Sequence, residues 1–140
     1  MRAVKFAAIF EPQPEGGYTV TFPDIPEAIT EGDTKEECLH HAEEVLTLCL
    51  EQRMDDGEAI PEATTVKGGI WIEPSAAMQA AVLVRSWRTK QGKSVSEMAR
   101  SLNTSWAAAQ KLESHRANPT LRQLERTAAA LGKRLHVEMV

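Results

Sequence analysis

The sequence predicts an α+β fold in two parts, a first half of strands around one long helix and a second half of short helices. Three observations lead to this prediction. Strand-like and helix-like periodicities follow one another in residues 1–73, turn signals separate short helical stretches in residues 75–140, and the two halves carry opposite charges. We therefore expect two domains, residues 1–73 and residues 75–140, which meet at Pro74 because proline cannot continue a strand.

Two strands and a turn open the chain. Residues 2–10 are apolar enough for a strand that is buried on both faces, and Gly16 and Gly17 supply the positive φ angles of a turn. Residues 18–22 alternate polar and apolar side chains, which is the period of a half-buried strand. We expect these two strands to pair as a hairpin, followed by a short third strand at residues 28–30.

A long amphipathic helix follows. Thr34 and Glu37 have the spacing of a capping box at its start, and the helix is expected to run to about Met54, before Gly57. The apolar residues at helical spacing on its inner face are Cys38, Leu39, Ala42, Val45, Leu46, Cys49 and Leu50. A last strand at residues 66–72 completes a β-β-β-α-β half, in which one helix lies on a small sheet.

Three helices are expected next. Ser75 can cap the first of them, residues 76–91, and Gly92 is suited to its C-terminal cap. The second and third helices, residues 95–102 and 106–113, are short and are separated by a tight turn.

A fourth helix and a terminal strand close the second half. Thr120 is expected to cap a helix that runs to Leu131. The residues expected to face inward from it are Leu121, Leu124, Ala128 and Leu131. Residues 133–140 have no sheet of their own, so we expect this strand to pair with the same strand of a second subunit. The sequence thereby predicts a homodimer or higher oligomer.

The turn between the two short helices suggests a helix-turn-helix motif. Asn103 tolerates the left-handed backbone of a sharp reversal, and Ser105 can cap the helix that follows. The small side chain of Ala99 would let the two helices cross closely. A generic helical hairpin is the alternative. In a helix-turn-helix, the second helix enters the major groove of DNA and the first helix crosses the backbone.

The second of these helices carries the candidate DNA-reading residues. Glutamine and lysine side chains recognise adenine and guanine edges, and alanine can touch a thymine methyl group. The predicted DNA-binding residues are Ser105, Trp106, Ala107, Gln110 and Lys111 on this helix, with Arg100 and Arg116 as phosphate contacts. Because the reading face is rich in alanine, we expect specificity to rest partly on DNA shape.

The charge of the chain is divided between its halves. Residues 1–74 hold 5 Lys/Arg and 16 Asp/Glu, a net charge of −11, whereas residues 75–140 hold 11 Lys/Arg and 4 Asp/Glu, a net charge of +7. A basic half suits a polyanion, and an acidic half suits a basic partner. We therefore expect the two halves to have different partners.

Composition excludes several classes of protein. With 42% hydrophobic and 26% charged residues, the chain is predicted to be a soluble cytoplasmic protein without a membrane span or signal peptide. Cys38 and Cys49 lie 11 residues apart on one predicted helix, about 16 Å along its axis, which is too far for a disulfide. His40 and His41 lack a second ligand pair at zinc spacing, so we predict neither a metal site nor a cofactor.

No catalytic motif is found. The carboxylates that gather after the second strand are Asp24, Glu27, Glu31 and Asp33, but no nucleophile or base accompanies them. Phosphate-binding glycine loops, nucleophile elbows and zinc-protease motifs are lacking as well. The sequence therefore predicts no enzyme, and an acidic rim that binds a basic protein fits the charges better.

Both halves together resemble the HicB family of antitoxins from bacterial type II toxin–antitoxin modules. The motifs that carry the resemblance are Gly17-Tyr18-Thr19-Val20, Phe22-Pro23-Asp24-Ile25-Pro26, Gly32-Asp33-Thr34 and Glu36-Glu37. The second half looks like the Cro/repressor helix-turn-helix that many HicB proteins carry, including Asn118-Pro119-Thr120 and Leu131-Gly132-Lys133. Two positions depart from the pattern: Glu27 stands where the family usually has glycine, and His115 stands where repressors often have a left-handed glycine.

The resemblance implies a fold and a function. The first domain is expected to have a small, degraded ribonuclease-H-like fold without catalysis, which binds and occludes a small HicA-type ribonuclease toxin. The second domain is expected to repress its own operon by binding operator DNA. For toxin contacts we favour the turn after the second strand, with Phe22, Asp24, Ile25 and Glu27. The alternatives are an orphan regulator with a sensing or oligomerisation domain, and an active RNase-H-like nuclease.

Overall fold

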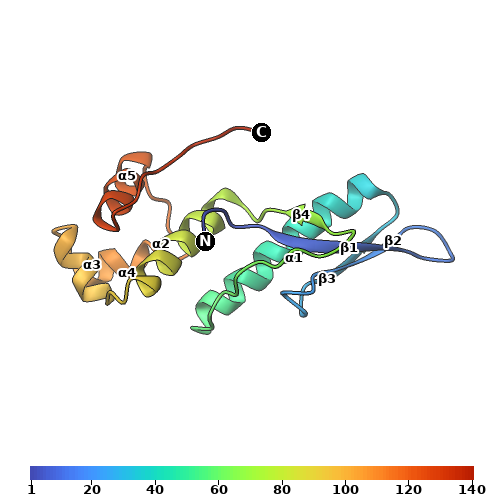
Figure 1. Cartoon of the computed structure of the whole chain (residues 1–140), viewed down its shortest axis with the longest axis horizontal. Coiled ribbons are helices and arrows are strands. Elements are labelled where there is room, and N and C mark those ends of the chain that lie inside the picture. Colours follow the sequence, from blue (N-terminus) through green and yellow to red (C-terminus); the bar gives the residue numbers. More distant parts are fainter. The chain divides into compact units, whose positions relative to one another are not determined.

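The computed structural model describes residues 1–140 and has a mixed α+β architecture, with an antiparallel sheet toward the N-terminus and helices toward the C-terminus (Figure 1). The chain divides into two compact units, Arg2–Gln79 and Ala80–Val140, called here the N-terminal and C-terminal units. They meet inside helix α2 (Ala76–Lys90). The assignment of separate roles to residues 1–73 and 75–140 stays a prediction.

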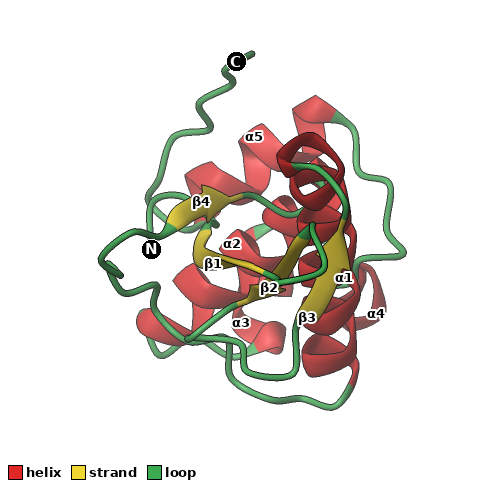
Figure 2. Ribbon diagram, turned by 90° about the vertical axis from the view of Figure 1, so that its right-hand side faces the viewer, coloured by secondary structure: helices red, strands yellow, loops and turns green.

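Four strands and one long helix build the N-terminal unit. In chain order they are β1 (Phe6–Pro12), β2 (Tyr18–Thr21), β3 (Ile29–Gly32), α1 (Lys35–Asp55) and β4 (Ile70–Ile72). The β-β-β-α-β order is therefore confirmed. All pairings are antiparallel, in the spatial order β3-β2-β1-β4, and Figure 2 shows the strands in yellow beside the helices in red. The predicted hairpin is the β1–β2 pair, in which Phe10 lies opposite Val20.

Helix α1 covers one face of this sheet. Phe6 lies opposite Ile72 in the register, and both side chains are buried together with Val20 and the α1 residue Leu46. The helix lies very near the sheet at Gly32, where an added Cβ atom would lie 2.8 Å from the Sγ atom of Cys38 on α1. A larger residue at Gly32 would therefore push the helix away from β3.

Both ends of α1 form near their predicted positions, with one difference in the capping. The Thr34 hydroxyl accepts a hydrogen bond from the Glu37 N–H at 3.1 Å, but the Glu37 carboxylate accepts from the Asp33 N–H rather than from Thr34. The predicted inner stripe was wrong at one position. Leu39 is 40% exposed, because α1 buries only the narrower row of Cys38, Ala42, Leu46 and Leu50 against the sheet.

The strand predicted at residues 66–72 is shorter than expected. Only Ile70–Ile72 pairs with β1, because the residues before it form a tight turn in which the Gly69 N–H donates to the Val66 carbonyl at 2.9 Å. Gly68 takes a φ of +76° in this turn, a conformation that strands do not contain.

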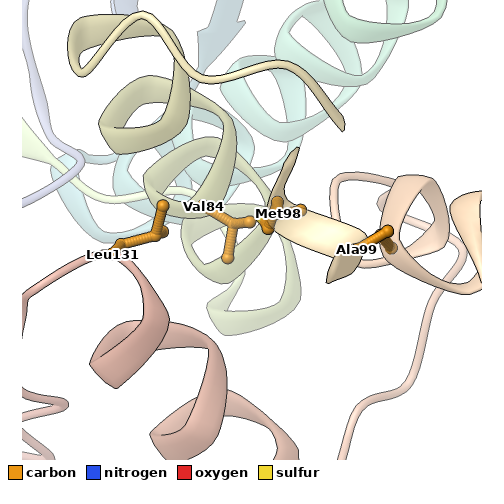
Figure 3. Packing of buried hydrophobic residues seen from close by; sticks show 5 residues of the cluster. Val84, Met98, Ala99 and Leu131 are labelled. Carbon is orange, nitrogen blue, oxygen red and sulfur yellow. The ribbon is translucent and has the colours of Figure 1, made fainter. Parts of the chain in front are cut away.

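The C-terminal unit is made of helices around a small core. After α2 its helices are α3 (Val95–Ser101), α4 (Trp106–Lys111) and α5 (Leu121–Ala130). The buried residues that pack together are Val84, Met98, Ala99, Ala109 and Leu131 (Figure 3). The partly buried Trp87, Val95, Leu102 and Leu112 surround this cluster.

One predicted inward position of the C-terminal unit was wrong, and the terminal strand that was expected to pair with a second subunit is not tested by a single chain. Leu121 is 63% exposed, since it is the first residue of α5, and Thr127 takes an inward position instead. Residues 133–140 form no strand in this single chain. A strand needs a hydrogen-bonded neighbour, and the C-terminal unit contains no sheet that would provide one.

Candidate interfaces for nucleic acid and a protein partner

Helices α3 and α4 are joined by a tight turn at Asn103 and Thr104, which is stabilised by local hydrogen bonds. Ser94 and Glu97 form a reciprocal capping box at the start of α3, with both hydrogen bonds 3.1 Å long. At the other end, Asn103 has a φ of +53°, as predicted, and its N–H donates to the Arg100 carbonyl. The Thr104 N–H donates to the Ala99 carbonyl at 3.0 Å, which completes a Schellman motif.

Helix α4 begins directly after this turn. The Ser105 hydroxyl accepts a hydrogen bond from the Ala108 N–H at 3.1 Å and so caps the helix as predicted. Ala109 is fully buried against Met98 and Ala99, and their small or flexible side chains let α3 and α4 lie close together. Helix α4 is shorter than predicted and ends at Lys111, with Leu112 as its C-terminal cap.

The predicted DNA-binding residues lie at the surface of the C-terminal unit. Ser105, Trp106, Ala107, Gln110 and Lys111 are all exposed on or beside α4, and the exposed fraction of Trp106 is 51%. Arg100 on α3 and Arg116 in the loop after α4 are also exposed. His115 stands where repressors often have a left-handed glycine, but its own backbone is not left-handed. Asn103 is the one non-glycine residue with a positive φ angle.

One buried ion pair fixes the far end of α4. The Arg88 side chain on α2 donates two hydrogen bonds to the Glu113 carboxylate, with Nε to Oε2 at 2.5 Å and Nη2 to Oε1 at 3.0 Å. A third donor, Nη1, bonds to the Lys93 carbonyl at 2.8 Å. The side chains are only 14% and 9% exposed, so this pair holds the end of α4 against α2. Sequence reasoning missed it, because the two partners lie 25 residues apart.

The predicted toxin-contact residues lie in a turn that is stabilised by burial and by hydrogen bonds within the N-terminal unit. Phe22 and Ile25 are 1% and 0% exposed, so both side chains lie in the core of this chain, and their assignment as contacts of a partner stays a prediction. The turn itself is closed by hydrogen bonds from the Ile25 N–H to the Phe22 carbonyl and from the Ala28 N–H to the Ile25 carbonyl.

The carboxylates of Asp24 and Glu27 in this turn each accept hydrogen bonds from a different part of the N-terminal unit. The Asp24 carboxylate accepts hydrogen bonds from the Thr64 N–H at 2.8 Å and the Thr64 hydroxyl at 2.7 Å. Glu27 accepts two from Arg53 on α1, at 2.5 and 2.8 Å, and the hydrogen bond from Arg53 lowers the pKa of Glu27. Both carboxylates therefore brace the turn against the rest of the N-terminal unit.

The remaining chemical groups form no reactive site. Cys38 and Cys49 are free thiols, and burial raises the pKa of both, so the thiolate forms are disfavoured. The Nδ1 atom of His41 lies 2.7 Å from the Glu31 carbonyl oxygen, and His40 pairs with Glu44 at 2.6 Å. No group of three or more His, Cys, Asp or Glu side chains is arranged to hold a metal ion.

Comparison with known proteins identifies the family. Residues 5–83 match the family model of HicB-like antitoxins of bacterial toxin–antitoxin systems. The chain belongs to the HicB-like antitoxin family. Antitoxin HicB 2 of Photorhabdus laumondii is 36% identical over 126 residues, which cover 90% of this chain and 88% of that relative. Members of this family are antitoxins and are not enzymes.

Two further similarities extend over most of the chain. Antitoxin HicB of Escherichia coli K12 is 28% identical over 138 residues, which cover 98% of this HicB-like chain and all of the relative. The crystal structure of the Burkholderia pseudomallei antitoxin HicB matches with a TM-score of 0.44 at 19% sequence identity, over 78% of this chain and 97% of that one. No helix of this HicB-like chain combines the length and the apolar composition that crossing a membrane requires.

Proposed function

We propose that this chain is an antitoxin that binds and inhibits a small HicA-type ribonuclease toxin and represses its own operon by binding operator DNA. The observation that carries the proposal is the division of charge in a HicB-like chain. The N-terminal unit has a net charge of −11 and the C-terminal unit one of +7. The predicted boundary at Pro74 and the boundary between the two units of the structure differ only by Ser75–Gln79, which contains no charged residue. The acidic unit suits a basic toxin, and the basic unit suits nucleic acid.

In the proposed DNA complex, α3 and α4 act as a helix-turn-helix. Helix α4 enters the major groove, where Gln110 and Lys111 contact base edges and Ala107 contacts a thymine methyl group. Arg100 and Arg116 bind phosphates on either side. The short turn at Asn103, the cap at Ser105 and the exposure of these side chains support this arrangement. The pair Arg88–Glu113 would keep α4 fixed when the phosphates attract the surrounding arginines.

The repressor is proposed to act as a dimer or higher oligomer. Two copies would place one α4 helix on each half of a palindromic operator. The extended residues 133–140 are exposed, with Val137 at 62% and Met139 at 97%, and two such tails would bury these apolar side chains by pairing with each other. Sedimentation that finds only monomer at micromolar concentration would contradict this part of the proposal.

Co-expression with the adjacent gene tests the two activities separately. We expect the intact chain to relieve the growth arrest caused by a small basic protein encoded beside it, and to repress a reporter placed behind its own promoter. Lys111→Ala should abolish repression and weaken operator binding about tenfold, while it leaves the rescue of growth intact. The matched control is Lys67→Ala, which removes the same charge from an exposed position of the acidic unit.

Each failure has its own meaning. Unchanged operator binding by Lys111→Ala would show that α4 is not the recognition helix. Repression without any rescue, or without a toxin gene next door, would favour an orphan transcriptional regulator instead. Operator binding should also fall steeply as salt is raised, because phosphate contacts release counterions.

A further inference from the structure

One face of the four-stranded sheet is left uncovered by α1. The contact between Gly32 and Cys38 identifies the face on which α1 lies. Tyr18, which is paired with Gly32, and Val20, two residues further along β2, share that face. Because strand side chains alternate, Thr19 and Thr21 must point to the opposite side. We call that side the open face of the sheet.

The strand register arranges the open face in rows. Ile9, Thr21 and Ile29 lie directly opposite one another on β1, β2 and β3, so two isoleucines flank a threonine across the sheet. The next row consists of Glu11, Thr19 and Glu31. On the other side of the isoleucine row, Trp71 of β4 lies opposite Ala7. The open face therefore has an apolar centre with an acidic row along one end.

Two large apolar side chains of this face are exposed. Ile29 is 58% exposed and Trp71 is 43% exposed, while Ile9 between their strands is half-buried. The Nζ atom of Lys5 lies 4.7 Å from the centre of the Trp71 ring, so a cation sits at the aromatic end. The carboxylates of Glu11 and Glu31 stand at the opposite end and are exposed. An apolar centre beside charged residues is the usual anatomy of a protein-binding surface.

We infer that the open face is the surface that binds the basic toxin, with Trp71 and Ile29 as apolar anchors and Glu11 and Glu31 as partners for its lysine or arginine side chains. This inference rests on the proposed antitoxin function and replaces the turn at Phe22–Glu27 as the toxin contact. The turn is braced by bonds within the chain, whereas the apolar side chains of the open face lack a cover.

The charges favour a basic protein over a second copy of this chain. A two-fold symmetric dimer through the open face would bring the same patch of each copy together. Such a dimer would bring together two units that each carry a net charge of −11. A basic partner turns that repulsion into attraction and gains association rate from it.

Calorimetric titration with the purified basic protein encoded beside this chain tests the inference. We expect Ile29→Glu to raise the Kd at least about tenfold, since it places an unpaired charge among the anchors. The matched control is Leu48→Glu, which makes the same kind of change at a 63% exposed position on α1 and should leave the Kd within about twofold.

A second variant keeps the apolar side chains of the open face and changes only charge at two exposed positions. The double charge reversal Glu11→Lys/Glu31→Lys should raise the Kd about tenfold, mainly through a slower association rate. Its matched control reverses two exposed glutamates of α1, Glu43→Lys/Glu44→Lys, and should change binding much less. Circular dichroism and the unfolding midpoint of each variant establish that the sheet is intact.

The outcomes separate this inference from the proposed function. If the unaltered chain fails to bind the neighbouring basic protein, the proposed function fails and the inference falls with it. If the unaltered chain binds and both open-face variants bind equally well, the antitoxin function stands and the open face is not its surface. If Ile29→Glu instead converts a dimer to a monomer without weakening toxin binding, the open face is a contact between copies of this chain, and the inference is overturned.

Discussion

The two units of this chain are stabilised in different ways. The N-terminal unit buries large side chains from distant parts of the sequence between one sheet and one helix, among them Phe6, Phe22 and Leu46. In the C-terminal unit, the cluster of buried residues that pack between its helices has five members, two of which are alanines. A core of that size contributes less hydrophobic free energy, so polar contacts must supply a larger share of the stability.

These polar contacts lie between the helices of the C-terminal unit. The Gln91 side chain donates to the Leu131 carbonyl at 2.6 Å, and the Lys93 ammonium donates to the Ala130 carbonyl at 3.1 Å, so both cap the end of α5. The Nζ atom of Lys133 lies 3.9 Å from the centre of the Trp87 ring. Such contacts order a small helical unit without a large core.

The largest effect is expected from a cavity in the sheet unit. Phe6→Ala should lower the free energy of unfolding of the N-terminal unit by about 4 kcal/mol, because a fully buried ring is removed. Calorimetry of the whole chain would resolve this loss from the transition of the C-terminal unit. Phe10→Ala, at a half-buried position of the same strand, should cost much less. If Phe6→Ala lowered the unfolding temperatures of both units equally, the two units would unfold as one, and the claim that they are stabilised separately would be contradicted.

A loss nearly as large is expected from the buried ion pair of the helical unit. Glu113→Ala should cost about 3 kcal/mol, because it leaves the Arg88 guanidinium buried without its carboxylate. Chemical denaturation in a Trp71→Phe/Trp106→Phe background, in which Trp87 is the remaining tryptophan, would measure it by fluorescence. The double variant Arg88→Met/Glu113→Leu should recover most of the loss. If it does not, the pair contributes through geometry that apolar packing cannot replace, and the contrast with the sheet unit becomes sharper.

A smaller effect is expected from a helix cap. Ser105→Ala should destabilise the C-terminal unit by about 1 kcal/mol, because the Ala108 N–H loses its acceptor in a helix of only six residues. Ser96→Ala, at an exposed position inside α3, serves as the control. Hydrogen exchange at α4 amides is the most direct measurement. Equal exchange in both variants would mean that packing of Ala109 alone holds α4.

The smallest effect concerns the exposed ion pair of the sheet unit and depends on pH. The hydrogen bond from Arg53 holds the pKa of Glu27 below its ordinary value of 4.5. Ionised Glu27 therefore adds stability above pH 4.5, and this contribution is lost as the pH falls through the lowered pKa.

Because the Glu27 side chain is 46% exposed, the contribution should stay below about 1 kcal/mol. Unfolding free energies of the intact chain and of Glu27→Gln should differ at neutral pH and converge in acid. A difference that persists in acid would assign the effect to packing instead.

The sequence alone was sufficient for features that depend on neighbouring residues. The caps at Thr34, Ser105 and Thr120 and the left-handed turn at Asn103 all follow from contacts within about four residues, and the β1–β2 hairpin closes over the predicted turn at Gly16 and Gly17. Side-chain chemistry and backbone preference act at that range, so local spacing predicts them. The β-β-β-α-β order followed from the same signals, and the opposite charges of the two halves needed only counting.

Only the tertiary structure decided which apolar residues are covered. Phe22 and Ile25 lie in the core, whereas Leu39, Leu121, Ile29 and Trp71 remain exposed. The pairs Glu27–Arg53, Asp24–Thr64 and Arg88–Glu113 join residues 25 to 40 positions apart, which no local pattern indicates.

The physical reason is that periodicity shows which side chains share a face and leaves open which face a neighbouring element covers. In this chain α1 packs on one face of the sheet, where the absence of a side chain at Gly32 leaves room for Cys38. Ile29 and Trp71 lie on the opposite face and stay exposed.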